Sequence, residues 1–211
     1  MTNDTSEVDV PTRPARVPRP KRHEVRQRVI DGAFAAFTER GFMGASIDLI
    51  CSYAGLSRGA FYSNFKDKEE LFFALYDRQA GFLTTRIRRA AIVMSESEKP
   101  AHVLSALINQ PDRDERRWDI LNKEFVIYAL RNQSARFKLN DRREHLRRDI
   151  STVLESVFAS LGRPIPHDID EYARVAMAIY EGNMTQQGLE PERTSDQSLL
   201  GRFFPVILQY G

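Results

Sequence analysis

The residues of this 211-residue chain whose types suit a specific chemistry lie close together, around the triplet Ser57, Arg58 and Gly59. Arginine can donate two hydrogen bonds to guanine, and glycine lets a backbone approach another surface closely. Hydroxyl, amide and lysine side chains can contact phosphates. The stretch therefore predicts contacts to a DNA duplex, made by Ser46, Ser57, Arg58, Gly59, Tyr62, Ser63, Asn64, Lys66 and Lys68.

Two aromatic residues within this stretch have a second interpretation. Phe65 is expected to pack in a core, because it shares a helical face with Phe61. Tyr62 shares the opposite face with Arg58, and for its ring both core packing and a phosphate contact stay open.

Three short helices are expected to position these residues. Apolar residues at helical spacing predict a first helix from Lys21, and Gly41 offers the positive φ that ends it. Ser46 and Ser57 have the hydroxyls of N-caps, and Gly55 between them can turn the chain sharply. The apolar stripes are Ile30, Ala33, Phe34 and Phe37 in the first helix, and Ile47, Ile50, Cys51 and Ala54 in the second.

The second and third helices are too short to be stable alone, since helices below about 12 residues are marginal in water. Packed together on the first helix, they form a helix-turn-helix. This arrangement presents the start of the third helix outward, which suits entry into a DNA major groove. Asp67 and Glu70 match a capping box that opens a long fourth helix, to about Met94.

The N-terminal segment has a different composition. Residues 1–20 contain four prolines and no apolar periodicity, which predicts a disordered or extended arm. Residues 11–28 carry seven cationic residues against one acidic residue, a net charge of +6. Such an arm either binds a polyanion or is a solvated tail.

Composition argues against several other classes of protein. The chain is 42% hydrophobic with a net charge of +2, and it has one cysteine and four widely separated histidines. No zinc-type spacing, HExxH motif or phosphate-binding glycine loop is present, so no cofactor, no metal and no enzymatic activity are expected. The sequence offers neither a membrane-length apolar run nor a secretory signal, which predicts a cytoplasmic protein.

The remaining sequence is expected to be helical throughout, which makes the protein all-α. Helices are predicted at about residues 100–109, 115–132, 134–161, 168–187 and 195–210. Residues 21–66 would form the DNA-binding domain and residues 67–211 a regulatory and dimerisation domain. Aromatic and apolar side chains between these parts could line a ligand cavity, although aromatics at helical spacing are mostly core: Phe82, Trp118, Leu121, Phe125, Tyr128 and Phe158.

The segment SIDLICSYAGLSRGAFYSNFKDKEEL, residues 46–71, resembles the N-terminal pattern of TetR-type transcriptional regulators without a gap. Cys51 departs from the alanine usual there. The resemblance implies a homodimer that places two recognition helices on a palindromic operator and is usually a repressor released by a small ligand.

The last two predicted helices carry more apolar surface than one amphipathic stripe requires, which favours a twofold interface over ordinary core. The interface candidates are Tyr172, Val175, Ala176, Ile179, Leu200, Phe203, Phe204 and Ile207. Two alternatives to the regulator stay open. One is an architectural protein that coats DNA without sequence preference, and the other is a helical small-molecule enzyme or carrier.

Overall fold

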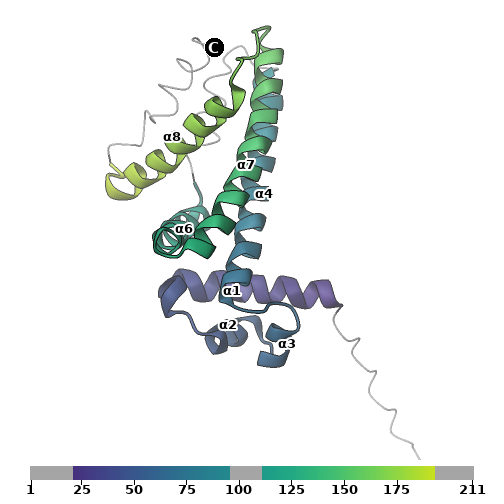
Figure 1. Ribbon diagram of the computed structural model, residues 1–211, viewed down its shortest axis with the longest axis vertical. Coiled ribbons are helices and arrows are strands. Elements are labelled where there is room, and N and C mark those ends of the chain that lie inside the picture. The colour runs from purple at the N-terminus through teal and green to yellow at the C-terminus, as the bar shows by residue number, and fades with distance from the viewer. Residues whose placement is uncertain (1–20, 96–110, 193–211) are drawn as a thin grey trace, which may run out of the picture.

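The computed structural model of the chain describes residues 21–95 and 111–192. Within these ranges all regular secondary structure is helical, which confirms the all-α prediction. None of the helices described is long and apolar enough to cross a membrane. The elements are α1 (Arg22–Gly44), α2 (Ile47–Ala54), α3 (Arg58–Tyr62), α4 (Lys68–Ser95), α6 (Arg113–Arg131), α7 (Gln133–Ser160) and α8 (Ile169–Leu189) (Figure 1).

Helices α1 to α3 form a unit at one end of the molecule, which we call the head (residues 21–66). Helix α1 lies across the beginning of α4, with α2 and α3 on its other side (Figure 1). A Cβ added to Gly32 would lie 2.7 Å from the carbonyl oxygen of Ile50 and 2.8 Å from the backbone nitrogen of Ala54. Helices α1 and α2 therefore cross with their backbones in contact, and only glycine fits at this crossing.

Helix α1 is interrupted at Gly41, where the sequence predicted its end. Gly41 has φ 72°, in the left-handed region that glycine adopts without steric cost. The break redirects the chain so that Phe42 enters the core with an exposed fraction of 4%.

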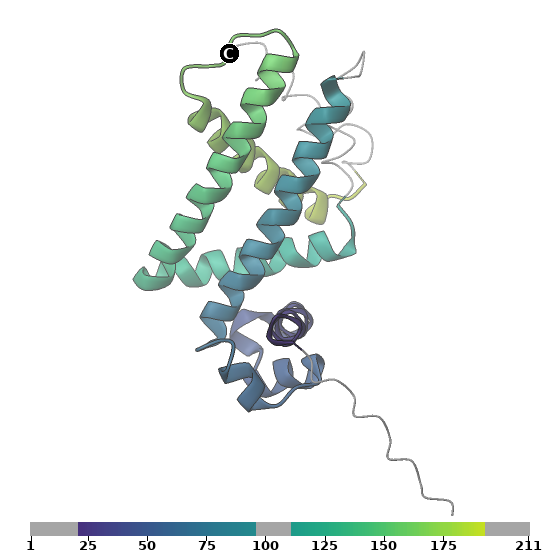
Figure 2. The same ribbon diagram turned by 90° about the vertical axis from the view of Figure 1, so that its right-hand side faces the viewer.

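The other four helices of the described ranges form the bundle (residues 67–95 and 111–192). Helices α4 and α7 are long neighbours, and α8 packs on α7 at an oblique angle. Helix α6 runs across the ends of α4 and α7 that are nearest the head, and it contacts α1 (Figure 2). Helix α6 is therefore placed to touch both parts of the molecule.

Two apolar clusters stabilise this arrangement. The junction core joins α1, α2, α3, α4, α6 and α7, and it includes Phe37, Phe42, Phe72 and Phe125. The rings of Phe72 and Phe125 stack with their centroids 3.6 Å apart. The outer core lies between α4, α7 and α8 and contains Ala90, Leu146, Ile150, Leu154, Val157, Phe158 and Ala173.

The helix boundaries differ from the prediction at one point of the head. Helix α3 ends at Tyr62, so Phe65 lies beyond it in the connection to α4 rather than within the third helix. Phe65 is nonetheless buried, with 1% of its surface exposed, as predicted. The predicted arm at residues 1–20 and the predicted helices at 100–109 and 195–210 lie outside the described residues.

Candidate nucleic-acid interface

The turn between α2 and α3 has the geometry that its glycine predicts. Gly55 adopts φ 61°, and its N–H donates to the carbonyl of Ser52 at 3.1 Å. The guanidinium of Arg28 closes the same helix end, because its Nη2 donates to the carbonyls of Ala54 at 2.9 Å and Gly55 at 3.0 Å. Arg28, which the sequence grouped with the basic segment, thus stabilises the turn.

The first residues of α3 are exposed. The Ser57 hydroxyl accepts a hydrogen bond from the backbone N–H of Ala60 at 3.2 Å, which confirms Ser57 as the N-cap. The Arg58 side chain is 63% exposed, and its Nε forms a salt bridge of 3.1 Å with Asp48 of α2. An exposed ion pair contributes only about 0–1 kcal/mol, so Arg58 can exchange this carboxylate for a base edge at little cost.

Gly59 and Tyr62 share the exposed side of α3. A Cβ added to Gly59 would meet only the Ser57 Oγ, at 3.7 Å, so no packing within the chain requires a glycine here. Tyr62 is 53% exposed, and its ring meets Phe61 edge-on with centroids 5.2 Å apart. Of the two interpretations of Tyr62, this arrangement favours the outward one, since the ring leans on the core while most of the side chain stays free.

The polar residues nearby in the sequence are exposed or half-buried. Ser46 is the N-cap of α2, with its hydroxyl accepting from the Leu49 N–H at 3.1 Å. The Ser63 hydroxyl donates to the carbonyl of Gly59 at 2.8 Å. The Asn64 amide donates to the carbonyl of Ala60 at 2.8 Å, while Lys66 has an exposed side chain. The Ser46 and Ser57 hydroxyls only accept in these contacts, so their hydrogens stay available to a phosphate, as do one Asn64 N–H and the Lys66 ammonium group, whereas Ser63 would have to release the Gly59 carbonyl first.

Lys68 requires a correction, because its side chain points into the protein. Its Nζ donates to the carbonyls of Ala45 at 2.7 Å, Phe42 at 3.1 Å and Met43 at 3.3 Å. An ammonium group has three hydrogens, so these bonds use its whole donor capacity. Burial lowers the pKa of Lys68. Lys68 therefore caps the end of α1 rather than contacting a phosphate.

Cys51 is buried on α2, and burial raises the pKa of its thiol. A thiol with a raised pKa is a poor nucleophile, which agrees with a packing role. The hydroxyl of the half-exposed Tyr53 donates to the carboxylate of Glu39, and this hydrogen bond raises the Tyr53 pKa. The Tyr53–Glu39 pair ties α2 to α1, and the sequence contains no spacing signal for it.

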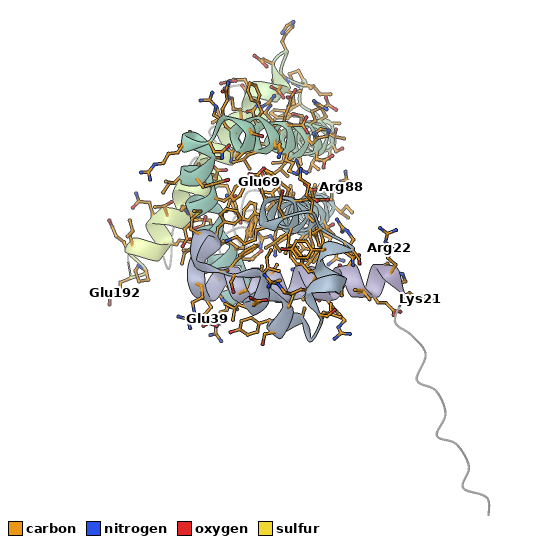
Figure 3. All side chains as sticks on the ribbon, turned by 60° about the horizontal axis from the view of Figure 1, so that its bottom comes forward. Lys21, Arg22, Glu39, Glu69, Arg88 and Glu192 are labelled. Atoms are coloured by element: carbon orange, nitrogen blue, oxygen red, sulfur yellow. The ribbon has the colours of Figure 1, made fainter. Side chains whose placement is uncertain are left out.

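The two ends of α1 have different surroundings. Lys21 and Arg22 lie at its first turn, at the edge of the molecule, whereas Glu39 lies near its other end (Figure 3). The cationic end is where residues 1–20 join the head. The cationic side chains that begin α1 are thus exposed at one edge of the head.

A carboxylate of the bundle fixes the break in α1. The Glu124 Oε2 of α6 accepts a hydrogen bond from the Phe42 N–H at 3.1 Å. A Cβ on Gly41 would approach the same oxygen to 2.6 Å. Beside it, Arg117 donates to the Thr38 hydroxyl at 2.5 Å and lies 5.4 Å from the centre of the Phe34 ring. Sequence reasoning missed these contacts because their partners are about 80 residues apart.

The chain resembles known proteins in both sequence and fold. Residues 29–75 match the model of the bacterial regulatory proteins of the tetR family. This segment contains most of α1, all of α2 and α3, and the start of α4.

The N-terminal domain belongs to the tetR family. One curated relative, the HTH-type transcriptional repressor AcnR of Corynebacterium glutamicum, is 35% identical over 88 residues, which are 42% of this chain and 43% of AcnR. The chain thus spans less than half the length of this relative.

Solved structures extend the similarity to the bundle. A Rhodococcus protein assigned to the TetR family of transcriptional regulators aligns with a TM-score of 0.68 at 19% identity, over 88% of this chain and 99% of that chain. SmeT, the repressor of the Stenotrophomonas maltophilia multidrug efflux pump SmeDEF, aligns with a TM-score of 0.55 at 22% identity, over 89% of each chain. The bundle therefore has the fold of TetR-family proteins.

The six predicted ligand residues do not surround one site in this TetR-type bundle. Leu121 and Phe125 are buried in the junction core, with Trp118 and Tyr128 packed against it. Phe158 belongs to the outer core, and Phe82 is 62% exposed. The prediction of a single aromatic-lined cavity is therefore withdrawn, because four of these side chains hold the head to the bundle.

Of the eight predicted dimer residues, four lie on α8, where some pack within the chain and one is exposed. Tyr172 and Ile179 pack against the outer core of the same chain, whereas Val175 is 40% exposed and Ala176 is half-buried. On α8, Val175 therefore offers the most exposed surface of the four. The other four residues, Leu200, Phe203, Phe204 and Ile207, lie outside the described residues, and the interface stays a prediction.

Proposed function

We propose that the protein is a sequence-specific DNA-binding transcriptional regulator, a dimeric repressor that a small ligand releases from a palindromic operator. The observation that carries this proposal is the exposed start of α3, where Arg58 and Tyr62 project beside a glycine with open space around it. An α-helix presented in this way fits a major groove, with arginine as a base-reading donor.

In this proposal each side chain has a defined task. Arg58 reads a guanine, and Gly59 allows the backbone to approach the groove. Phosphates are contacted by the hydroxyl, amide and ammonium groups around them, and these contacts set the orientation of the head without carrying sequence information. The phosphate-contacting residues proposed are Ser46, Ser57, Tyr62, Ser63, Asn64 and Lys66.

The proposal divides the chain into a DNA-binding head and a regulatory bundle that also dimerises. A ligand changes operator affinity only if it binds unequally to the two arrangements of the head. Helix α6 is suited to transmit such a difference, because Glu124 and Arg117 hold α1 directly. Dimerisation through α8 would place two heads on successive turns of one DNA face.

Selection of DNA fragments from a random pool by the full-length protein tests the proposal. We expect enrichment of a palindromic site that is bound at least about 10³-fold more tightly than random duplex at the same salt concentration. Equal affinity for random duplex would favour the architectural protein instead. No DNA association at low salt, together with turnover of a substrate, would favour an enzyme.

The Arg58→Ala variant tests the base-reading task. It should weaken operator binding by about 1–3 kcal/mol and relax the preference at one base pair of each half-site. Arg40→Ala is the matched control, because the Arg40 side chain is also 63% exposed but pairs with Glu39 at the opposite end of α1. An unchanged base preference in Arg58→Ala would refute this role.

A further inference from the structure

Asn183 on α8 is a buried amide that has no hydrogen-bond partner among residues 21–95 and 111–192. Its exposed fraction is 1%, and neither its Oδ1 nor its Nδ2 has a partner in the part of the chain that the structure describes. Buried polar atoms in folded proteins nearly always have partners, because an unpaired group loses its hydration without compensation. An amide with both ends unpaired therefore indicates a place that accepts a hydrogen-bonding group from outside the described residues, and a bound ligand can supply such a group.

The neighbours of Asn183 show where this amide lies. Tyr180 precedes it by three residues, so the two side chains share one face of α8. The Tyr180 hydroxyl accepts a hydrogen bond from Nη2 of Arg86 on α4 at 3.3 Å, and Nη1 of Arg86 pairs with Glu115 on α6. The face of α8 that carries Asn183 is thus turned toward α4 and α6.

Arg86 at this meeting of helices, and Asn122 two turns further along α6, each carry one more buried atom that is unpaired among the described residues. Asn122 follows Glu115 by seven residues on α6, which places both on one helix face. The Asn122 Oδ1 and the Arg86 Nε are buried and have no partner among the described residues. Among the described residues, the Asn183 Oδ1 is thus an unpaired acceptor, and the Asn183 Nδ2 and the Arg86 Nε are unpaired donors.

The charged groups of the region are already neutralised. Arg86 pairs with Glu115, Arg143 with Glu181 at 2.5 Å, and Lys123 with Asp119. Burial raises the pKa of the Tyr180 hydroxyl, which therefore stays neutral at physiological pH. A charged ligand would lack an unpaired counter-ion among these residues, and a buried charge without one is unfavourable.

We propose that Asn183 binds the polar end of the effector, and that this end is an uncharged planar amide with a carbonyl beside an N–H, as in a lactam. The Asn183 amide presents an acceptor and a donor side by side, so it forms two parallel hydrogen bonds with such a group. The apolar remainder of the effector packs against Leu83 and Tyr180, which line the outer core. This inference rests on the proposed regulatory function, whose effector class it specifies.

Binding of lactams to the full-length protein without DNA tests the inference. The probes are pyrrolidone, ε-caprolactam and laurolactam, measured by calorimetry and by the ¹⁵N side-chain resonance of Asn183. We expect at least one lactam to bind and to shift that resonance. Its N-methyl derivative, which lacks the donor, and hexanoate, which carries a charge, should bind at least about tenfold more weakly, as expected for a lost contribution of about 1.4 kcal/mol.

The Asn183→Leu variant distinguishes a binding role from a structural one. Its affinity for the lactam should fall by at least about tenfold. Its melting temperature should stay the same or rise, because an unpaired buried amide is replaced by an apolar side chain. Gln186→Leu, an exposed position on the same helix, is the control and should change neither quantity.

Three outcomes would overturn the inference: no lactam binding, equal binding of hexanoate, or a lower melting temperature of Asn183→Leu. Since these measurements use no DNA, they can fail while selection from the random pool still yields an operator. Conversely, lactam binding without a selected DNA site would retain the ligand site and reject the proposed regulator.

Discussion

The side chains that join the head to the bundle and the amide of Asn183 differ in how their polar atoms are paired. At the junction, Lys68 donates to three carbonyls, and Glu124 accepts from the Phe42 N–H. Glu69 accepts from the Tyr128 hydroxyl at 3.1 Å and from Lys138 at 2.6 Å. Around Asn183, buried polar atoms have no partner among the described residues. The carboxylate and ammonium groups of the junction are thus paired within the chain, whereas the unpaired Asn183 amide is the feature on which the proposed effector site rests.

The largest expected effect concerns the aromatic packing of the junction. Phe125 and Phe158 are both fully buried, and truncation of such a residue typically costs about 3–5 kcal/mol of unfolding free energy. Phe125→Ala should cost more than Phe158→Ala, because the Phe125 ring has several ring neighbours, including Phe72 at 3.6 Å. Phe158 has a contact of 6.1 Å with Tyr172. Urea denaturation of both variants measures the difference, and a larger loss for Phe158→Ala would reverse the comparison.

The next largest effect is expected from removal of the Lys68 ammonium group, which caps the end of α1. Lys68→Met keeps the aliphatic length but removes three hydrogen bonds, and it should reduce the free energy of unfolding by about 2 kcal/mol. Lys66→Met is the control, since this exposed residue should change stability by less than about 0.5 kcal/mol. Chemical denaturation gives stability, and operator titration at several salt concentrations gives the number of phosphate contacts. A stable Lys68→Met protein with a reduced salt slope would restore Lys68 to the phosphate-contacting set.

A smaller effect is expected from the carboxylate that holds the break in α1. Glu124→Leu leaves the buried Phe42 N–H unpaired and should cost about 1 kcal/mol of unfolding free energy. Glu124→Gln retains an acceptor and should cost less. Thermal unfolding followed by circular dichroism compares the two variants. Equal melting temperatures for both would show that the hydrogen bond contributes nothing to the junction.

The smallest effect is expected from Asn122, which lies on α6 together with Glu124. Asn122→Leu removes an unpaired carbonyl oxygen, so its unfolding free energy should stay the same or rise by up to about 1 kcal/mol. Glu124 lies two residues further along α6, and its replacement by leucine is expected to lower the unfolding free energy instead. Denaturation of both leucine variants in one buffer makes the comparison. If Asn122→Leu were as destabilising as Glu124→Leu, the two regions would not differ in polar satisfaction.

Local features of the head could be predicted from the sequence. Ser46 and Ser57 are N-caps, and Gly41 and Gly55 have positive φ, because each of these roles depends on backbone atoms only a few residues away. Asp67 likewise accepts from the Glu70 N–H at 2.8 Å. The Glu70 carboxylate, however, accepts from the backbone N–H of Lys66 and not from that of Asp67, so the capping box is not completed.

Features that join distant segments could not be predicted. A lysine in a solvated loop and a lysine that caps a helix look alike in sequence, and Lys68 is distinguished only by the position of residues 42–45. Aromatic spacing showed that Trp118, Phe125 and Phe158 face inward, but the spacing could not show which of two cores receives them. The unpaired state of Asn183 likewise depends on α4 and α6, which the sequence does not position.

The hydrogen bond from Phe42 to Glu124 has a consequence for building hybrid regulators. A cut between residues 66 and 67 separates the head from the carboxylate that fixes its first helix and from Lys68, which closes that helix. Heads transplanted onto foreign helices at this point would require an acidic side chain and an ammonium group in the same places. Exchange of recognition specificity in this protein is therefore better made by replacing exposed side chains of α3 than by joining fragments.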